Sequence, residues 1–180
     1  MRISGGELRS RILRTPPGDA LRPTPARAKE ALFSIVGERI SGARVLDLYA
    51  GSGAIGFEAL SRGALHATFV ELHAPTAAAI RRSAEELGVE KLTSVVCAPA
   101  EKAVQRVAGH FDFVYADPPY ALPPPHLTFG TLRTRGSIDT ATVLVYEHRS
   151  DGIAFASPGF VTQREARYGE ATLQFLNVVP

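Results

Sequence analysis

The segment Asp117-Pro118-Pro119-Tyr120 carries the residue types that bind a planar amine. Its two prolines fix the backbone and leave carbonyl oxygens free to accept hydrogen bonds. The Asp117 carboxylate and the Pro118 carbonyl can accept both N–H groups of one exocyclic amine, hold its nitrogen toward a methyl donor and stabilise the developing charge. Tyr120 can stack on the face of a flipped base. The segment therefore predicts chemistry on a nucleobase amine, and its alternative is an ordinary strand-to-loop turn.

A glycine loop, Gly51-Ser52-Gly53-Ala54-Ile55-Gly56, lies between a predicted strand and a predicted helix and matches G-x-G-x-x-G. Glycines here let the backbone approach a ligand, because no Cβ stands in the way. The pattern alone fits a nicotinamide dinucleotide equally well, and a tight strand–helix turn is its purely structural explanation. Neighbouring residues must decide between these ligands.

Two acidic residues beside the glycine loop favour a cationic ligand without phosphate. Asp47 lies inside the preceding strand, four residues before Gly51, where it would repel a pyrophosphate and attract an ammonium group. Glu71 ends the next strand, where a carboxylate can accept both hydroxyls of a ribose; the alternative is an exposed acid at a strand end. A ribose, a cationic amino-acid end and no phosphate describe S-adenosylmethionine, which we expect as the cofactor.

Alternating strands and helices must position these residues. The predicted strands are 45–49, 68–71, 92–97, 111–116 and 142–147, and the predicted helices between them are 54–62, 75–87 and 101–108. This alternation predicts an α/β fold, with a parallel sheet covered on both faces. Residues 160–168 and 171–179 flank a Gly-Glu turn and predict an antiparallel hairpin that closes the sheet. Carboxyl ends of parallel strands share one edge, where we expect the glycine loop and the Asp-Pro-Pro-Tyr segment together.

The first residues form a basic segment of different character. Residues 1–30 contain seven Lys and Arg against three Asp and Glu, a balance of +4, whereas the whole chain carries +2. We expect residues 1–20 to form a hairpin-like β extension and residues 21–180 to form the main domain, whose first helix has Thr24 as its N-cap and Pro25 at its first position. A basic extension on a near-neutral body is typical of phosphate binding, and a solvated surface segment is the alternative.

The overall composition excludes several classes of protein. With 45% hydrophobic and 21% charged residues among 180, the chain is typical of one globular domain rather than a disordered or coiled-coil protein. Cys97 is the single cysteine, which excludes an intramolecular disulfide, and its apolar strand predicts a buried side chain. The five histidines share no ligand spacing, so no metal is expected. Without a membrane-length apolar run or a signal peptide, we expect a cytoplasmic protein.

These motifs carry a resemblance to a known family. Residues 45–56 resemble motif I of class I S-adenosylmethionine-dependent methyltransferases, and residues 117–120 resemble motif IV of their amine-methylating members. The wider chain resembles the RsmD family, the bacterial 16S rRNA guanine-N2 methyltransferases. The matching stretches are MRISGG at 1–6, RPTPARAKEALF at 22–33, VLDLYAGSGAIGFEALSRGA at 45–64, DPPY at 117–120 and, more loosely, YGEATLQFL at 168–176.

The resemblance implies a Rossmann-like class I methyltransferase fold, with a seven-stranded, mostly parallel sheet, an antiparallel last strand and a short N-terminal β extension. It implies methyl transfer to the N2 amine of a guanine in 16S rRNA, within the small ribosomal subunit or its assembly intermediate. Separately from the resemblance, we expect a monomer without metal. The implied cofactor residues are Asp47, Tyr49, Ala50, Gly51, Ser52, Gly53, Glu71, Leu72, Ala98 and Ala100; the catalytic residues are Asp117, Pro118, Pro119 and Tyr120; the RNA-binding residues are Arg2, Arg9, Arg11, Arg14, Arg22, Thr24 and Arg27.

One position departs from the family pattern. Similar family members often carry Asn or Asp near the end of the third strand to meet the adenine amine, whereas this chain has Pro99. Proline has no side-chain acceptor, so we expect backbone groups of Ala98 or Ala100, or the Glu101 side chain, to meet the adenine.

Three alternative functions remain open from the sequence. The same chemistry fits adenine N6 or cytosine N4 in DNA, because the Asp-Pro-Pro-Tyr segment does not separate these amines. A non-catalytic RNA-binding assembly module on the same fold is a second alternative, although such a module has no use for Asp47, Glu71 and Asp117 together. A nicotinamide-dependent oxidoreductase is the third, and Asp47 weakens it.

Overall fold

The computed structural model describes residues 1–15 and 26–179. Its helices are α1 (Ala26–Val36), α2 (Ala54–Ser61), α3 (Ala74–Leu87), α4 (Ala100–Ala103) and α5 (His126–Thr134), with short 3-10 helices η1 (Gly37–Ile40) and η2 (Glu90–Leu92). Its strands are β1 (Arg44–Leu48), β2 (His66–Glu71), β3 (Thr93–Cys97), β4 (Phe113–Ala116), β5 (Val143–Arg149), β6 (Phe160–Tyr168) and β7 (Ala171–Val178).

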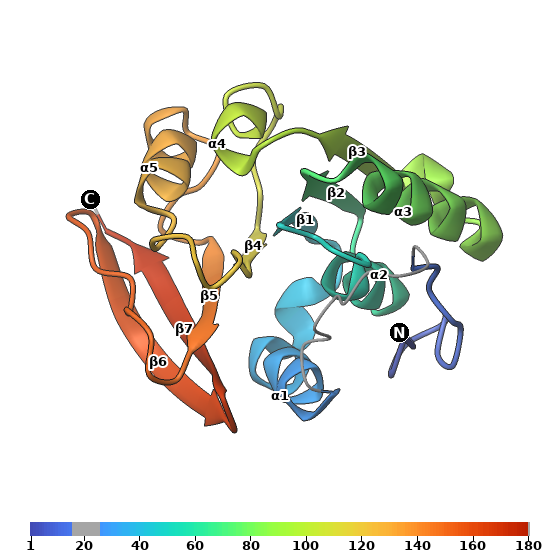
Figure 1. Cartoon of the computed structure of the whole chain (residues 1–180), viewed down its shortest axis with the longest axis horizontal. Helices are drawn as coiled ribbons and strands as arrows, with labels where there is room; N and C mark the ends of the chain where they lie inside the picture. Colours follow the sequence, from blue (N-terminus) through green and yellow to red (C-terminus); the bar gives the residue numbers. More distant parts are fainter. Residues whose placement is uncertain (16–25, 180) are drawn as a thin grey trace.

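The strands form one sheet in the order β3-β2-β1-β4-β5-β7-β6 (Figure 1). Strands β1 to β5 pair in parallel, whereas β7 is antiparallel to both β5 and β6. The predicted α/β class I methyltransferase fold, with its reversed last strand, is confirmed. The strand that follows β1 in the chain pairs along one edge of β1, and the chain later returns to place β4 along the other edge of β1. In such sheets, ligands bind beyond the carboxyl ends of the strands at this point of reversal.

Two apolar layers hold the sheet. Strands β1 and β4 are buried because helices cover both of their faces. One face packs against α1, α2 and α3 through side chains such as Leu32, Phe57 and Ile80. The other face packs against α4 and α5 through side chains such as Ala103 and Phe129. The strand ends therefore have fixed positions, as the site requires.

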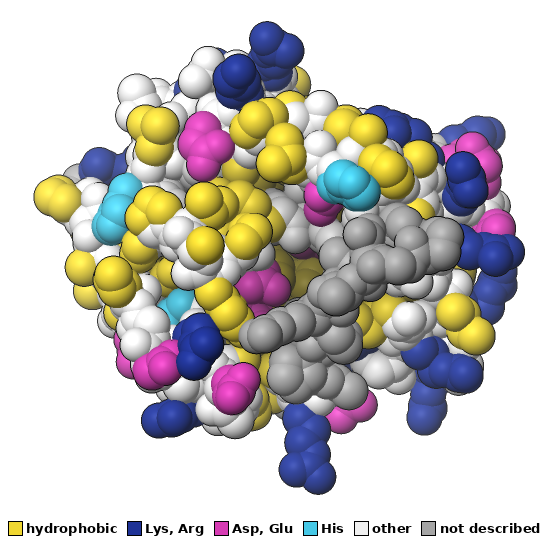
Figure 2. Space-filling view, viewed as in Figure 1, with side chains coloured by type: hydrophobic (Ala, Val, Ile, Leu, Met, Phe, Trp, Pro, Cys, Tyr) yellow, Lys and Arg dark blue, Asp and Glu magenta, His cyan; other side chains and the backbone are white. Residues whose placement is uncertain are grey.

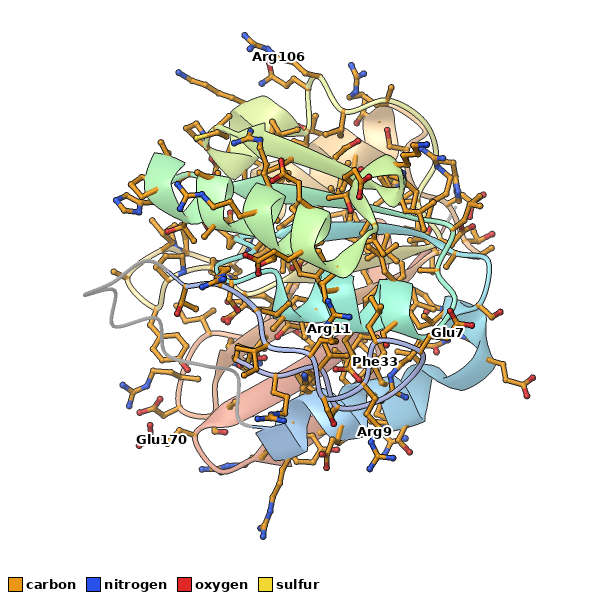
Figure 3. All side chains as sticks on the ribbon, turned by 90° about the vertical axis from the view of Figure 1, so that its right-hand side faces the viewer. Glu7, Arg9, Arg11, Phe33, Arg106 and Glu170 are labelled. Atoms are coloured by element: carbon orange, nitrogen blue, oxygen red, sulfur yellow. The ribbon has the colours of Figure 1, made fainter. Side chains whose placement is uncertain are left out.

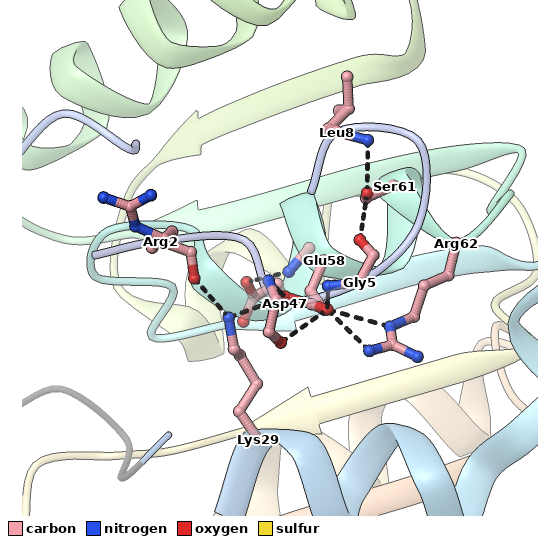
Figure 4. A network of polar contacts seen from close by, with 10 residues as sticks. Arg2, Gly5, Leu8, Lys29, Asp47, Glu58, Ser61 and Arg62 are labelled. Carbon is pink, nitrogen blue, oxygen red and sulfur yellow. Dashed lines mark hydrogen bonds and ion pairs between the residues drawn. The ribbon is translucent and has the colours of Figure 1, made fainter. Parts of the chain in front are cut away.

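The N-terminal arm, residues 1–15, folds back on itself and packs against α2. Arg2 and Ile12 form an antiparallel bridge, and the side chains of Ile3 and Leu13 are buried. The arm also donates two backbone N–H groups, each at 2.8 Å, to the carboxylate of Glu58 on α2 (Figure 4). The predicted boundary between residues 20 and 21 and the predicted helix start at residue 24 lie outside the described residues.

The sequence pattern did not predict α5. Its nine residues include three threonines and a glycine, which are poor helix formers. The buried side chains of Phe129 and Leu132 pack into the apolar layer. Tertiary packing therefore stabilises a helix that local propensity does not predict.

Two other local predictions are wrong. Cys97 is exposed rather than buried, because β3 is an edge strand in which no residue is fully buried. The predicted helix at 101–108 is shorter, since α4 ends at Ala103. The apolar residues around Cys97 correctly indicated a strand. They did not show that this strand lies at the edge of the sheet.

Candidate active site

One large cavity, of about 1280 Å³, opens at the carboxyl ends of β1, β2, β4 and β5. Acidic side chains are visible inside a hollow on the face shown in Figure 2. The structure brings nearly all predicted cofactor and catalytic residues together here. Those lining the cavity are Asp47, Tyr49, Ala50, Gly51, Ser52, Glu71, Leu72, Ala98, Ala100, Asp117, Pro118, Pro119 and Tyr120. Gly53 is outside the lining and is the N-cap residue of α2.

Four carboxylates reach the cavity from one face of the sheet. On one side, Asp47 on β1 pairs with the β2 residue that precedes Glu71 by two positions. On its other side, Asp47 pairs with the β4 residue that precedes Asp117 by two positions. The residue two positions before Glu147 on β5 continues the same row. Side chains two apart along a strand point to the same face. The four carboxylates therefore converge at the carboxyl edge, as their lining of one cavity shows.

The glycine loop is a tight turn with left-handed backbone at three positions. The φ angles are 58° at Tyr49, 53° at Gly51 and 75° at Gly53, whose N–H donates to the Ala50 carbonyl at 2.7 Å. For tyrosine, this conformation costs about 1 to 2 kcal/mol, whereas glycine adopts it freely. The turn brings the first residues of α2 to the wall of the cavity.

Asp47 links the end of β1 to the start of α2. Its Oδ2 accepts the Gly56 N–H at 2.9 Å, and its side chain is buried. Burial raises the pKa of Asp47 to about 8, and the nearby charge of Glu71 adds to this, although the hydrogen bond from Gly56 opposes it. Asp47 is therefore a positioning residue for the loop as well as an acid at the cavity wall.

Glu71 is held by backbone groups on both sides. Its Oε2 accepts the Gly51 N–H and its Oε1 accepts the His73 N–H, each at 2.8 Å. A carboxylate oxygen has more than one acceptor position, so both oxygens retain capacity for further donors. The carboxylate is thus fixed beside the glycine loop, in the position expected of a group that accepts two ribose hydroxyls.

The Asp-Pro-Pro-Tyr segment continues directly from β4 into the cavity. Asp117 is half-buried, Pro118 is buried, and Tyr120 is 44% exposed. The Arg149 guanidinium lies 5.7 Å from the centre of the Tyr120 ring. Burial raises the pKa of Asp117 well above its usual range, and the charges of Glu147 and Asp47 raise it further. This carboxyl group therefore binds a proton, or a hydrogen-bond donor, more readily than an exposed aspartate does.

Glu147 and Arg149 line the same cavity, and the sequence analysis missed both. The buried carboxylate of Glu147 accepts a hydrogen bond from the Tyr115 hydroxyl. Burial raises the pKa of Glu147, although this hydrogen bond opposes the shift. No motif marks these residues in the sequence. The available signal was an acid in an otherwise apolar predicted strand that ends at the same sheet edge.

The expected adenine end of the cavity contains Ala98, Pro99, Ala100 and Glu101. The Ala98 N–H donates to the Glu71 carbonyl at 3.1 Å, so it already has a partner within the sheet. The Glu101 carboxylate lies 3.5 Å from the Tyr49 hydroxyl. Burial is the main cause that raises the pKa of Tyr49 to about 12, and the charge of Glu101 contributes next. Glu101, which the sequence already suggested for this role, is the acidic side chain that lines the cavity at this end.

The predicted RNA-binding arginines of the arm differ in their contacts. Arg11 donates to the Glu86 carbonyl on α3 at 2.6 Å, and Arg14 forms an ion pair with the Glu86 carboxylate at 2.9 Å. Arg2 donates to a carbonyl of the arm itself. Arg9, labelled in Figure 3, and Arg27 on α1 are exposed. The remaining two predicted residues, Arg22 and Thr24, lie outside the described part of the chain.

Residues 1–15 and 26–179 contain neither a candidate metal site nor a membrane-spanning helix. No group of three or more His, Cys, Asp or Glu side chains there is arranged to hold a metal ion. No helix there has the length and apolar character needed to span a membrane.

Comparisons with known proteins agree with this geometry. The model of a family described as conserved hypothetical protein 95 matches residues 1–177. Ribosomal RNA small subunit methyltransferase D of Escherichia coli K12 is 31% identical over 171 residues, covering 94% of this chain and 86% of the relative. The protein of the same name from Haemophilus influenzae is 37% identical over 124 residues, covering 67% and 64%.

The fold comparison covers almost the whole chain. The solved structure of yhhF from Escherichia coli has a TM-score of 0.87 and 29% identity, covering 99% of this chain and 97% of that chain. Sequence and structure are therefore similar over the same length, including both the arm and the cavity. The chain belongs to the RsmD family and is a methyltransferase of the class I fold.

Proposed function

We propose that this protein transfers the methyl group of S-adenosylmethionine to the exocyclic 2-amino group of a guanine in 16S rRNA. The observation that carries the proposal is that one cavity joins the glycine loop and Glu71 to the Asp-Pro-Pro-Tyr segment. A cofactor at the loop and an amine at the segment would share one cavity. Holding two reactants in this way makes the reaction effectively unimolecular.

The charges of the cavity fit this cofactor. Its lining contains Asp47, Glu71, Asp117 and Glu147, and Arg149 is the one Lys or Arg among the described lining residues. A diphosphate would meet several carboxylates and little positive charge, whereas a sulfonium and an ammonium group would be attracted. The residues present therefore fit S-adenosylmethionine better than a nicotinamide dinucleotide.

Each part of the cofactor has a candidate partner. Glu71 binds the ribose hydroxyls, and Asp47 with the glycine loop binds the methionine end. Leu72, Ala98 and Pro99 offer apolar contacts to the adenine, and Glu101 is the available acceptor for its amine. When bound, S-adenosylmethionine supplies an electrophilic methyl group.

The protein's own residues orient the amine and receive its proton. The Asp117 carboxylate and the Pro118 carbonyl accept the two N–H groups, which holds the nitrogen in position for attack. Pro119 restricts the turn, and the half-exposed Tyr120 ring stacks on the base. As the amine nitrogen becomes bonded to the methyl group, it loses a proton to Asp117 Oδ or to water. The raised pKa of Asp117 favours this transfer.

The proposed substrate is the RNA of the small ribosomal subunit, assembled or partly assembled. Relatives named ribosomal RNA small subunit methyltransferase D support this choice. The exposed Arg9 and Arg27 offer positive charge for its phosphates. The target guanine must leave its stack to reach Asp117. We further propose that the protein acts in the cytoplasm, as a monomer and without a metal.

The test is methyl transfer from labelled S-adenosylmethionine to small subunits from a strain that lacks this gene, with naked rRNA and duplex DNA in parallel. Products are digested to nucleosides and identified by mass spectrometry. N2-methylguanosine from the subunit supports the proposal. Methylated adenine or cytosine overturns the substrate assignment, and cofactor binding without transfer to any substrate indicates a non-catalytic module.

Asp117→Ala is the matched inactive variant. It is expected to abolish transfer while S-adenosylmethionine binding, measured by calorimetry, stays nearly unchanged. Retained transfer would show that Asp117 does not hold the amine.

A further inference from the structure

Glu147 lies beside Asp117 at the base-binding end of the cavity. Strands β4 and β5 are parallel and in register from Phe113 and Val143 onward, so residue 147 continues the row of residue 117. Neighbouring strands are about 4.8 Å apart. Both side chains line the cavity. Two carboxylates therefore stand next to each other where the proposed mechanism uses only one.

The Glu147 carboxylate is fixed and partly engaged. Its Oε2 accepts the hydrogen bond from the Tyr115 hydroxyl, and Tyr115 lies on the neighbouring strand β4. Within the described residues, no side chain or backbone donor is recorded at Oε1. Since both Glu147 and Tyr115 line the cavity, Oε1 is available to a donor on a bound ligand.

The Watson–Crick edge of guanine presents the donor that this arrangement lacks. Its N1–H lies directly beside the 2-amino group, and the two point in nearly the same direction. A base whose amine is held by Asp117 therefore directs N1–H to the neighbouring acceptor. Adenine N1 and cytosine N3 carry lone pairs at the corresponding positions and would face a carboxylate unfavourably.

We propose that Glu147 is the specificity-determining residue that accepts the N1–H of the target guanine. This inference rests on the proposed function, because it assumes a base whose amine is held by Asp117. Tyr115 acts through Glu147 as a positioning residue. Burial raises the pKa of Glu147, and an N–H donor from the base would favour the ionised carboxylate that accepts it.

The test changes the hydrogen-bonding group both on the base and on residue 147. Small subunits are reconstituted with 16S rRNA that carries, at the mapped target, either guanine or 2-aminopurine. 2-Aminopurine keeps the 2-amino group but has a lone pair at N1 in place of N–H. Single-turnover methyl transfer is measured on both particles with the wild-type protein and with Glu147→Gln, whose amide can donate to that lone pair.

The wild type is expected to methylate guanine about 10- to 100-fold faster than 2-aminopurine, which is the usual discrimination that one good base contact provides. Glu147→Gln is expected to lose at least about 10-fold of this preference by gaining relative activity on 2-aminopurine. The ratio comes from one enzyme preparation, so a reduced folded fraction cancels. Glu101→Gln makes the same substitution at the other end of the cavity and is expected to keep the wild-type ratio.

The outcomes separate this inference from the proposed function. If the wild type methylates guanine but Glu147→Gln keeps the wild-type ratio, Glu147 does not read N1–H and the inference is wrong. If the wild type methylates no guanine in the particle, the proposed function itself fails. If Glu147→Gln transfers too slowly to measure, competition binding of the two particles, with S-adenosylhomocysteine present, gives the same ratio and the same decision.

Discussion

Replacing Glu58 by glutamine should loosen the N-terminal arm and destabilise the fold. Glu58 is fully buried on α2 and accepts hydrogen bonds from Lys29 Nζ at 2.8 Å and from the Arg62 guanidinium at 2.9 Å. It also accepts the backbone N–H groups of Ser4 and Gly5, each at 2.8 Å (Figure 4). Glutamine removes the negative charge and turns one acceptor oxygen into an NH2 group that faces donors.

The magnitude follows from the burial of the partner that is left behind. Lys29 is only 3% exposed, and removing one member of a buried ion pair typically costs about 3 to 5 kcal/mol. With a urea dependence of about 2 kcal/mol per molar, the midpoint of unfolding should fall by about 1.5 to 2.5 M. Burial would raise the pKa of Glu58, but the donors from Lys29, Ser4 and Arg62 outweigh it and lower the pKa. The carboxylate therefore stabilises the fold above its unfolded pKa, and this stabilisation is lost as the pH falls through the lower folded value.

Urea unfolding followed by circular dichroism at neutral and acid pH measures this effect. The matched control is Glu86→Gln, which removes an exposed ion pair with Arg14 of the same arm. The Arg14 side chain is 65% exposed and the Glu86 side chain is 46% exposed. Such a pair contributes little, so the control midpoint should hardly move. Equal midpoints for the two variants, or a difference that does not shrink in acid, would refute the reasoning.

Four further predictions concern other parts of the molecule. Burial raises the folded pKa of Asp47 to about 8, above an unfolded value of about 3.9, so its stabilising contribution is complete in acid and is lost as the pH rises through about 8. Asp47→Asn should therefore make the free energy of unfolding, measured with urea, depend less on pH between about pH 4 and 8. An unchanged pH dependence would contradict this. Gly56→Ala should cost about 1 to 3 kcal/mol, because its Cβ would lie 2.3 Å from a buried phenylalanine ring on β2. Gly130→Ala, in open space on α5, should be neutral or stabilise by up to about 1 kcal/mol in the same urea unfolding assay. Arg9→Ala should weaken small-subunit binding and its salt dependence, whereas Arg14→Ala, whose guanidinium already pairs with α3, should change both less in filter binding.

The position of the cavity could be predicted because each of its main residues lies in, at the end of, or directly after a strand that is recognisable locally. Asp47 lies inside one apolar run, Glu71 ends the next, and Asp117 directly follows another. Parallel strands in an α/β fold present their carboxyl ends at one edge. The order of elements was therefore enough to bring these residues together, and no long-range information was required.

Glu147 could not be predicted as a site residue, because its role depends on strand register. In the sequence it is an acid within a predicted strand, between Tyr146 and His148, and no motif surrounds it. Only the pairing of β5 with β4 brings it beside Asp117. Register is fixed by packing between segments about 30 residues apart, so the local sequence does not contain it.

The charge of the arm shows a similar limit. Counting Lys and Arg predicted a phosphate-binding extension, but Arg14 pairs with Glu86, a residue 72 positions away. A charge count includes such paired residues together with exposed ones such as Arg9. Only the fold distinguishes arginines that hold the arm on α3 from arginines available to another molecule.

The acidity of the cavity connects stability with function. Burial raises the pKa values of Asp47, Asp117 and Glu147, so the folded protein keeps these carboxyl groups at a cost in stability. Apolar side chains of similar size would remove that cost, and the apolar layers on both sides of the sheet show that this fold uses them freely. A ligand that brings positive charge and N–H donors would compensate this cost. The cationic methyl donor and the proposed guanine, with its adjacent amine and N1–H groups, bring both, so the same acidic lining fits the cofactor and the proposed substrate.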